Sequence, residues 1–198
     1  MNSKRIATGV ALSLLAACGS DSATNVINGA VSGSLSFNYT GGGGGSFSAT
    51  GAITSAALAS SPFTTMWAAG FKDSTDNSTN IAANIPRTST TSDLTAITVK
   101  GQSTGTFNID VNCVGSSTSA CNDVALFTAQ SAGAQTFGNA CSLTSGSITV
   151  STLSSTSAVG TFAGSGTCVT PTGGTSTWVV INGTFNVPLL VNPPSTIR

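Results

Sequence analysis

Alternation of apolar and hydroxyl-bearing residues constrains the fold of this chain more than any other feature. From Val31 to Tyr39, the apolar and aromatic side chains share one parity, while serines and an asparagine occupy the other. A period of two places the first set on one face of a β-strand and the second set on the opposite face. Similar runs recur along the chain with polar turn sequences between them, which is typical of a β-sandwich or barrel.

The pattern predicts an all-β domain, an antiparallel β-sandwich with a β-barrel-like arrangement as the alternative. There is no Glu, and no long segment has helical periodicity. Hydrophobic residues make up 39% of the chain, enough to argue against disorder. The expected strands fall at residues 31–39, 47–53, 66–71, 81–85, 94–99, 107–113, 124–129, 148–150, 159–168 and 178–187.

Five consecutive glycines, Gly41 to Gly45, separate the first two expected strands. We interpret them as the tip of a β-hairpin. The alternative, a linker between domains, would leave residues 31–39 as an isolated strand, which is not stable by itself.

The tripeptide Gly-Thr-Phe begins three of the expected strands, at Gly105, Gly160 and Gly183. In each copy we expect the Thr to face outward and the Phe inward, with the Gly relieving strain at a bend. The copies are too unevenly spaced to form a repeat architecture.

The N-terminus has the organisation of an export signal. Lys4 and Arg5 precede an uncharged run from Ile6 to Ala17, which is too short to span a bilayer. The sequence Leu15-Ala16-Ala17-Cys18 that ends it resembles the lipobox of bacterial lipoproteins. An ordinary secretory signal cut nearby, leaving Cys18 as a free thiol, is the alternative.

The lipoprotein resemblance implies a covalent lipid on Cys18, removal of residues 1–17 as a signal peptide, and attachment to a membrane through several acyl chains. Gly19 follows the cysteine, which favours delivery to the outer membrane. We therefore expect an exported protein of the bacterial cell envelope, facing the periplasm or the cell surface. Residues 18–28 would form a tether, 29–192 a single β domain and 193–198 a C-terminal tail.

A second resemblance covers the C-terminal part, from Ser147-Ile148-Thr149-Val150 to Asn182-Gly183-Thr184-Phe185-Asn186-Val187. These segments are similar to small exported lipoproteins of unknown function. The likeness implies a sandwich-like β domain and brings no activity with it.

Four cysteines remain after Cys18, and an even number in an exported chain predicts disulfides. A turn at Ser154 to Ser157 would place Cys141 opposite Cys168. Cys113 and Cys121 are symmetric about the middle of the loop between two expected strands. We therefore predict Cys113–Cys121 and Cys141–Cys168. A redox or zinc site has no CxxC and no His to support it.

Two further groups of residues are candidates for ligand binding. Asp73, Asp76, Asn77 and Asn80 bring several oxygen ligands into one loop, as calcium prefers, but the spacing matches no EF-hand and an Asx-rich turn explains it. Trp67 and Trp178 could be exposed platforms for sugar rings, although both lie in apolar alternating runs that favour core packing. We expect no cofactor other than the lipid on Cys18.

Composition argues against catalysis. The absence of His removes Ser-His-Asp and Cys-His mechanisms, and the only acids are Asp. Asp110 is expected on the outward face of a strand, as a solvated carboxylate. Loss of Lys4 and Arg5 leaves four basic and six acidic residues, so we expect no nucleic-acid partner. We predict a non-enzymatic structural or interaction protein; the alternatives are a carbohydrate- or small-ligand-binding module and, second, a hydrolase.

Overall fold

A computed structural model describes residues 32–53, 64–74, 76–110, 121–131 and 137–190. The predicted signal peptide, the lipidation site at Cys18, the tether, the tail and Cys113 lie outside these residues. Within the described part of the chain, no helix has the length and apolar character needed to cross a membrane.

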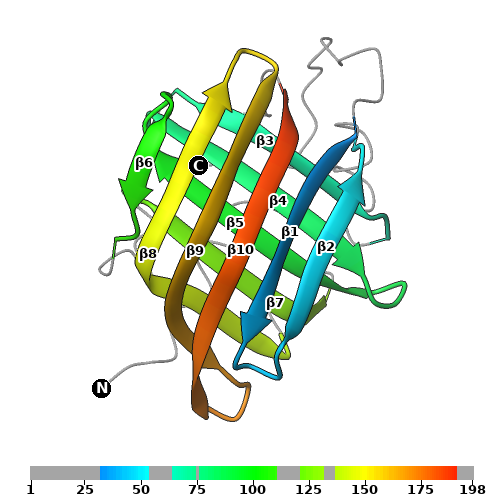
Figure 1. Ribbon diagram of the computed structural model, residues 1–198. Coiled ribbons are helices and arrows are strands. Elements are labelled where there is room, and N and C mark those ends of the chain that lie inside the picture. The colour runs from blue at the N-terminus through cyan, green and yellow to red at the C-terminus, as the bar shows by residue number, and fades with distance from the viewer. Residues whose placement is uncertain (1–31, 54–63, 75, 111–120, 132–136, 191–198) are drawn as a thin grey trace.

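The described chain folds into ten strands, which confirms the all-β prediction (Figure 1). Every expected strand has a counterpart. In order they are β1 (Gly33–Thr40), β2 (Gly45–Gly51), β3 (Trp67–Asp73), β4 (Ser78–Pro86), β5 (Thr91–Lys100), β6 (Gly105–Asn108), β7 (Asp123–Ser131), β8 (Asn139–Leu153), β9 (Ser157–Val169) and β10 (Thr175–Leu190).

Seven of these strands close into a ring, in the order β10, β3, β4, β5, β7, β8, β9 and back to β10. All neighbours in the ring are antiparallel except β10 and β3, which pair in parallel through Leu189 and Leu190. The hairpin of β1 and β2 extends from β10, and β6 pairs with β8. The strand pairing therefore forms a closed barrel, which was the alternative expectation. The β-sandwich expected first is not confirmed.

The barrel has two layers, which we call front and back (Figure 1). The front layer contains β6, β8, β9, β10, β1 and β2, and the back layer contains β3, β4, β5 and β7. The two longest strands join the layers. The start of β8, residues 139–142, pairs with β7, and the end of β10 pairs with β3.

The main core lies between the layers and is rich in aromatic side chains. Phe37 lies at its centre, with ring centroids 5.2 Å from Phe47, 5.5 Å from Phe162 and 6.3 Å from Trp178. Two smaller apolar clusters are built on the back layer by the side chains of opposite parity, one around Trp67 and one around Phe127. The back layer is thus buried on both faces.

The five glycines form a hairpin tip, so the alternative of an interdomain linker is wrong. Tyr39 pairs with Gly45, and Gly44 N–H donates to the carbonyl of Gly41. The tip packs tightly: a Cβ on Gly41, where φ is 82°, would lie 1.6 Å from the carbonyl oxygen of Thr177. A Cβ on Gly42 would lie 2.6 Å from Sγ of Cys168. Residues without side chains are therefore required for the tip to cover this end of the barrel.

The predicted disulfide Cys141–Cys168 is confirmed. A tight turn from Ser154 to Ser157 pairs Leu153 with Ala158, and two register shifts further along the hairpin bring the cysteines directly opposite each other. The other predicted link, Cys113–Cys121, involves a residue outside the described part and stays a prediction.

The strand expected at residues 107–113 is shorter than predicted. β6 ends at Asn108, after which Ile109 N–H donates to the carbonyl of Gly146 and Asp110 N–H to that of Asn122. The exposed Asp110 therefore lies beyond the strand and not on its outward face. Its Oδ2 accepts the backbone N–H of Asn122, a local contact that a short polar side chain makes readily.

Candidate interaction surface

A continuous row of hydroxyl side chains crosses the outer face of the front layer. Each strand contributes one residue, and each residue is directly opposite the next in the sheet register. We call this the hydroxyl row: Thr106 (β6), Thr149 (β8), Thr161 (β9), Thr184 (β10), Ser36 (β1) and Ser48 (β2). Neighbouring strands lie ~4.8 Å apart, so the row is a regular array of alcohol groups.

Several hydroxyls of the outer face hydrogen-bond across the strands. Oγ1 of Thr106 lies 3.0 Å from Oγ1 of Thr149, and Oγ of Ser36 lies 3.1 Å from Oγ1 of Thr184. A hydroxyl has one donor and two acceptor sites. Each pair therefore holds its side chains in place and still has a donor and acceptor sites for a partner.

Three of the four threonines in the row come from the Gly-Thr-Phe copies. The expected orientation is confirmed, because Thr161 and Thr184 are exposed while Phe162 and Phe185 are each 2% exposed. The third copy provides Thr106. What the tripeptides did not reveal is that the three threonines lie in one row, since that depends on pairing between strands distant in sequence.

The glycines of two copies lie beside irregularities in the strand pairing, as expected of a bend, and they also make room for aromatic rings. Gly160 pairs with Phe185, and Gly183 pairs with Phe162. A Cβ on Gly160 would lie 2.4 Å from the ring of Phe185, and one on Gly183 would lie 2.7 Å from the ring of Phe162. Each glycine makes room for the phenylalanine of the other copy, an arrangement known from glycines covered by aromatic rings in sheets.

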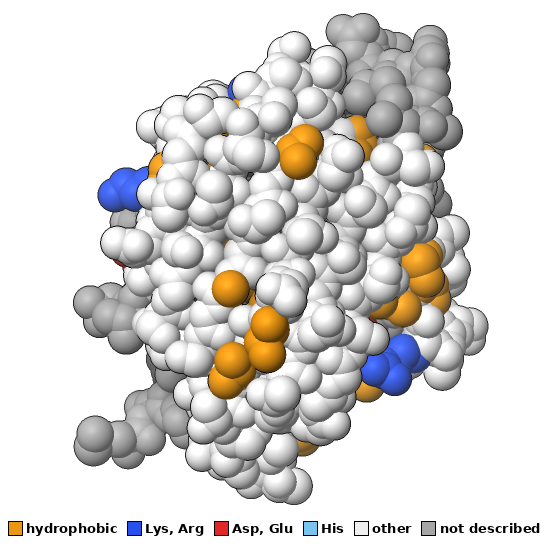
Figure 2. All heavy atoms as spheres, viewed as in Figure 1, with side chains coloured by type: hydrophobic (Ala, Val, Ile, Leu, Met, Phe, Trp, Pro, Cys, Tyr) orange, Lys and Arg blue, Asp and Glu red, His pale blue; other side chains and the backbone are white. Residues whose placement is uncertain are grey.

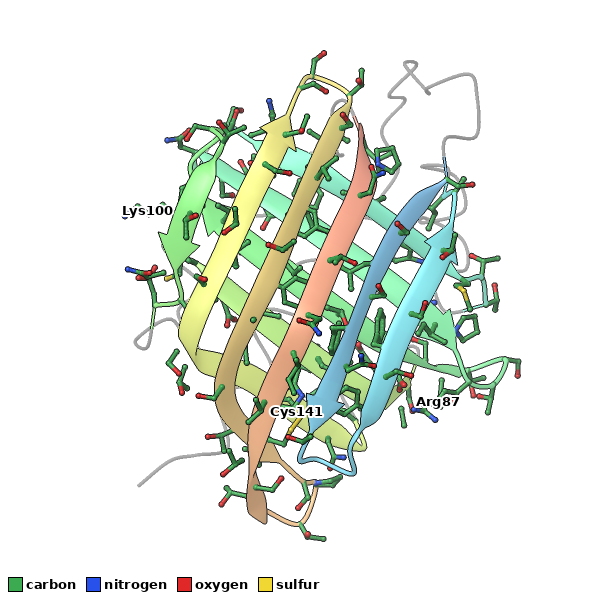
Figure 3. The ribbon with its side chains drawn as sticks, viewed as in Figure 1. Arg87, Lys100 and Cys141 are labelled. Carbon is green, nitrogen blue, oxygen red and sulfur yellow. A yellow bond between two sulfur atoms is a disulfide. The ribbon has the colours of Figure 1, made fainter. Side chains whose placement is uncertain are left out.

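The six front strands contain no Lys, Arg, Asp or Glu. In the described chain, charged residues lie on the back strands and in loops: Lys72, Asp73, Asp76, Arg87, Asp93, Lys100, Asp110 and Asp123. Figure 2 shows the front face as mostly uncharged, with scattered hydrophobic patches and with basic side chains at its rim, and Figure 3 places Arg87 and Lys100 at opposite margins. This surface offers hydrogen bonds and apolar contacts, including the side chain of Ile181 on β10, which is 47% exposed, but no ion pairs.

The clearest charged contact joins Arg87 and Asp93 at the turn between β4 and β5. Nε of Arg87 donates to Oδ1 of Asp93 at 2.7 Å, and a second guanidinium nitrogen contacts Oδ2. Oδ1 also accepts the backbone N–H of Ala129 at 2.9 Å, where β7 has a bulge. With both oxygens occupied, this carboxylate fixes the turn and the bulge and is poorly placed to act as a base.

Tyr39 lies near this pair at the edge of the core. Burial raises the pKa of its phenol, the negative charge of Asp93 raises it further, and Arg87 opposes the change. The phenol therefore remains protonated at neutral pH and cannot act as a ready nucleophile.

Asp123, at the start of β7, has a pKa raised by burial, which a hydrogen bond from Ser142 Oγ at 3.0 Å and one from the backbone of Val124 partly offset. Raised carboxyl pKa values occur in active sites, but also in structural positions. Asp123 contacts a hydroxyl and a backbone group, so burial in a structural position accounts for its raised pKa.

Within the calcium candidate, Asp73 and Asp76 are joined by a turn hydrogen bond. Oδ1 of Asp73 accepts the backbone N–H of Asp76 at 3.3 Å, and Asn77 has a positive φ of 50°. Asn80 belongs to β4, where its side chain donates to Ser78 and accepts from Thr98. Across the described ranges, no group of three or more His, Cys, Asp or Glu side chains could hold a metal ion.

Neither tryptophan is an exposed platform, so that prediction is wrong and the favoured core packing is confirmed. Trp178 is fully buried against Phe37 and Tyr39. Trp67 is 4% exposed and packs in the back-layer cluster with Ile53 and Leu94. Trp178 shares its strand parity with the buried Val180, and Trp67 shares its strand parity with the buried Ala69, so both indoles face apolar clusters.

No protein-family model, curated protein or solved structure matches this chain. The class defined by the fold is a closed all-β barrel with an added hairpin. The resemblances to lipoproteins noted in the sequence stay predictions.

Proposed function

We propose that this chain is a lipid-anchored protein of the bacterial cell envelope that acts by contact and not by catalysis. The observation that carries the proposal is the hydroxyl row on a front layer whose strands contain no charge. Such a face forms neutral hydrogen bonds to an uncharged partner. It would not attract nucleic acid, which is bound mainly through cationic side chains.

The anchor in this proposal is Cys18, with residues 1–17 removed, and the location is the outer membrane. The disulfide Cys141–Cys168 supports export, because disulfides persist chiefly in oxidising compartments such as the periplasm. The link Cys113–Cys121 would belong to the same framework.

The two alternatives have less support. A carbohydrate module with an aromatic platform would need an exposed indole, and both tryptophans are buried. A hydrolase would need acids gathered around a substrate, whereas Asp93 is held by Arg87 and Asp123 contacts Ser142. A neutral glycan could still bind the hydroxyl row directly, so glycans belong among the ligands to be tested.

Two measurements test the proposal separately. The variant Cys18→Ser should lose acyl-chain labelling and leave the membrane fraction; membrane retention at high salt would place the anchor elsewhere.

The second measurement tests contact through the front face. The protein released by Cys18→Ser should co-sediment with isolated envelope fragments. The double variant Thr161→Lys with Thr184→Lys should abolish co-sedimentation, while Ser89→Lys with Thr90→Lys, in an exposed loop, should not. Equal binding by both double variants would contradict contact through the front layer.

A further inference from the structure

In the described chain, the outer edge of β2, the outermost strand of the front layer, has no partner strand. Among these residues β2 pairs only with β1, over an unbroken register from Gly33–Gly51 to Tyr39–Gly45. Natural proteins usually protect such edges with charged residues, prolines, bulges or short strands. β2 has seven residues and none of these features, whereas β6 at the other side of the front layer has four residues.

The sequence of β2 is a palindrome in chemical type. Gly45 and Gly51 end the strand, hydroxyl residues occupy positions 46, 48 and 50, and apolar residues occupy positions 47 and 49. Ser48 is the central residue. An antiparallel strand placed beside β2 therefore meets matching side chains when it has this same sequence.

We propose that two copies of this protein pair through β2, antiparallel and about a two-fold axis at Ser48. Ser48 then lies opposite Ser48 of the second copy, and Ser46 lies opposite Thr50 of the second copy. On the inner face, Phe47 lies beside Ala49 of the second copy, so a large side chain meets a small one at both ends of the contact. Two-fold pairing of one patch with itself is the commonest symmetry of protein assemblies.

The physical properties of the strand favour a second copy over an unrelated peptide. Both faces of β2 continue an existing pattern: Phe47 and Ala49 are 2% and 0% exposed in the main core, and Ser48 ends the hydroxyl row. Pairing would continue the row into the second molecule. No like charges meet in the contact, and serine and threonine hydroxyls can hydrogen-bond across the new strand pair. This inference does not depend on the lipid anchor or on the contact proposed for the front face.

Disulfide trapping in the full-length protein tests the pairing. In antiparallel strands, opposite Cα atoms lie ~4.5 to 5.5 Å apart, within the reach of a disulfide. Ser48→Cys should therefore give a covalent dimer on a non-reducing gel after mild oxidation. The matched control is Ser36→Cys, in the same row but one strand further in, where the two copies would place the cysteines roughly 14 Å apart. Trapping at both positions, or at neither, would overturn the proposal.

Sedimentation of the full-length protein in detergent gives an independent measurement. The parent should sediment as a dimer, and Ser48→Lys should weaken the dimer by about two- to fivefold by placing like charges directly opposite each other. Thr161→Lys, exposed at the centre of the row on β9, should leave the dimer unchanged. A monomeric parent, or equal weakening by both variants, would show that β2 does not pair with a second copy.

Discussion

The front and back layers belong to one barrel but differ in what their outer faces do. Along β9, exposed and buried residues alternate, and its outward side chains are mostly small and uncharged. Along β5, six consecutive residues from Ser92 to Ile97 are buried, so both of its faces are covered. The comparison teaches that a layer with only one buried face has its other face accessible to a partner, whereas a layer buried on both faces does not.

The burial of polar groups differs in the same way. On the front layer, hydroxyls pair with one another at the surface, as Ser145 and Ser165 do at 2.8 Å. On the back layer, Ser92, Thr95 and Gln130 are buried with side-chain atoms that have no hydrogen-bond partner among the described residues, and on the front layer the same holds for Nε1 of Trp178. Buried polar atoms without partners reduce stability. We therefore expect the back layer to tolerate polar substitution poorly and the front layer to tolerate it well.

The largest expected effect comes from placing a lysine on each layer. Ala82→Lys puts a charge into the apolar cluster of the back layer, where Ala82 is 5% exposed, and should lower the free energy of unfolding by about 4 kcal/mol. Thr161→Lys on the front layer should change it by less than ~0.5 kcal/mol. Urea denaturation measures both, and equal losses would show that the layers do not differ as described.

Removal of the disulfide tests how much this link, at the junction of the front and back layers, contributes to the free energy of unfolding. Cys141 pairs with Cys168 on β9 and with Leu126 on the back strand β7. The double variant Cys141→Ala with Cys168→Ala should lose ~3.5 kcal/mol, from greater chain entropy in the unfolded state. Thermal unfolding of parent and variant, each with and without reductant, measures this. If reductant destabilises the variant as much as the parent, another disulfide accounts for the effect.

Substitutions in the glycine and phenylalanine pairs beneath the hydroxyl row should lower the free energy of unfolding by less. Gly160→Ala introduces a methyl group against the ring of Phe185 and the carbonyl of Thr149, and should cost about 2 kcal/mol. Combining it with Phe185→Leu should recover part of that loss, because the smaller side chain makes room. A double-mutant cycle in urea gives the coupling energy; additive losses would mean that the ring does not restrict position 160.

The smallest effect concerns the pH dependence of stability on the back layer. Because burial raises the pKa of Asp123, the folded state binds more protons than the unfolded state at this site, and stability falls as pH rises through the raised pKa. Asp123→Asn keeps an oxygen for Ser142 but removes the titration. Urea midpoints measured from about pH 4 to about pH 7 should fall less for the variant than for the parent. Parallel curves would contradict a raised pKa.

The front layer was the more predictable half from the sequence. Residues 159–168 and 178–187 both lie inside observed strands, although the buried parity of β10 changes between Val180 and Gly183, where the pairing is irregular. Cys141–Cys168 could be predicted since a local hairpin fixes its register. The hydroxyl row could be anticipated only in part: the Gly-Thr-Phe copies indicate outward threonines, but their alignment depends on pairing between distant strands.

The back layer and the closure of the barrel were less predictable. Ile81, Ala83 and Ile85 indicate one buried face of β4, but Ala82 and Asn84 are buried as well, on the other face. Continuous burial weakens the period of two that marks a strand with one exposed side. Closure depends on a short parallel pairing of Leu189 and Leu190 with Gly70 and Phe71, which no local pattern signals.

The central claim, that the front layer is a contact surface, is tested most directly by labelling in the intact envelope. Single cysteines at Thr161 on the hydroxyl row and at Ser89 in an exposed loop are compared for their rate of reaction with a bulky maleimide, in envelopes and in the purified protein. The account predicts that Thr161→Cys is protected in the envelope relative to the purified protein, while Ser89→Cys reacts equally fast in both. Equal reactivity of Thr161→Cys in the two states would contradict contact through this face.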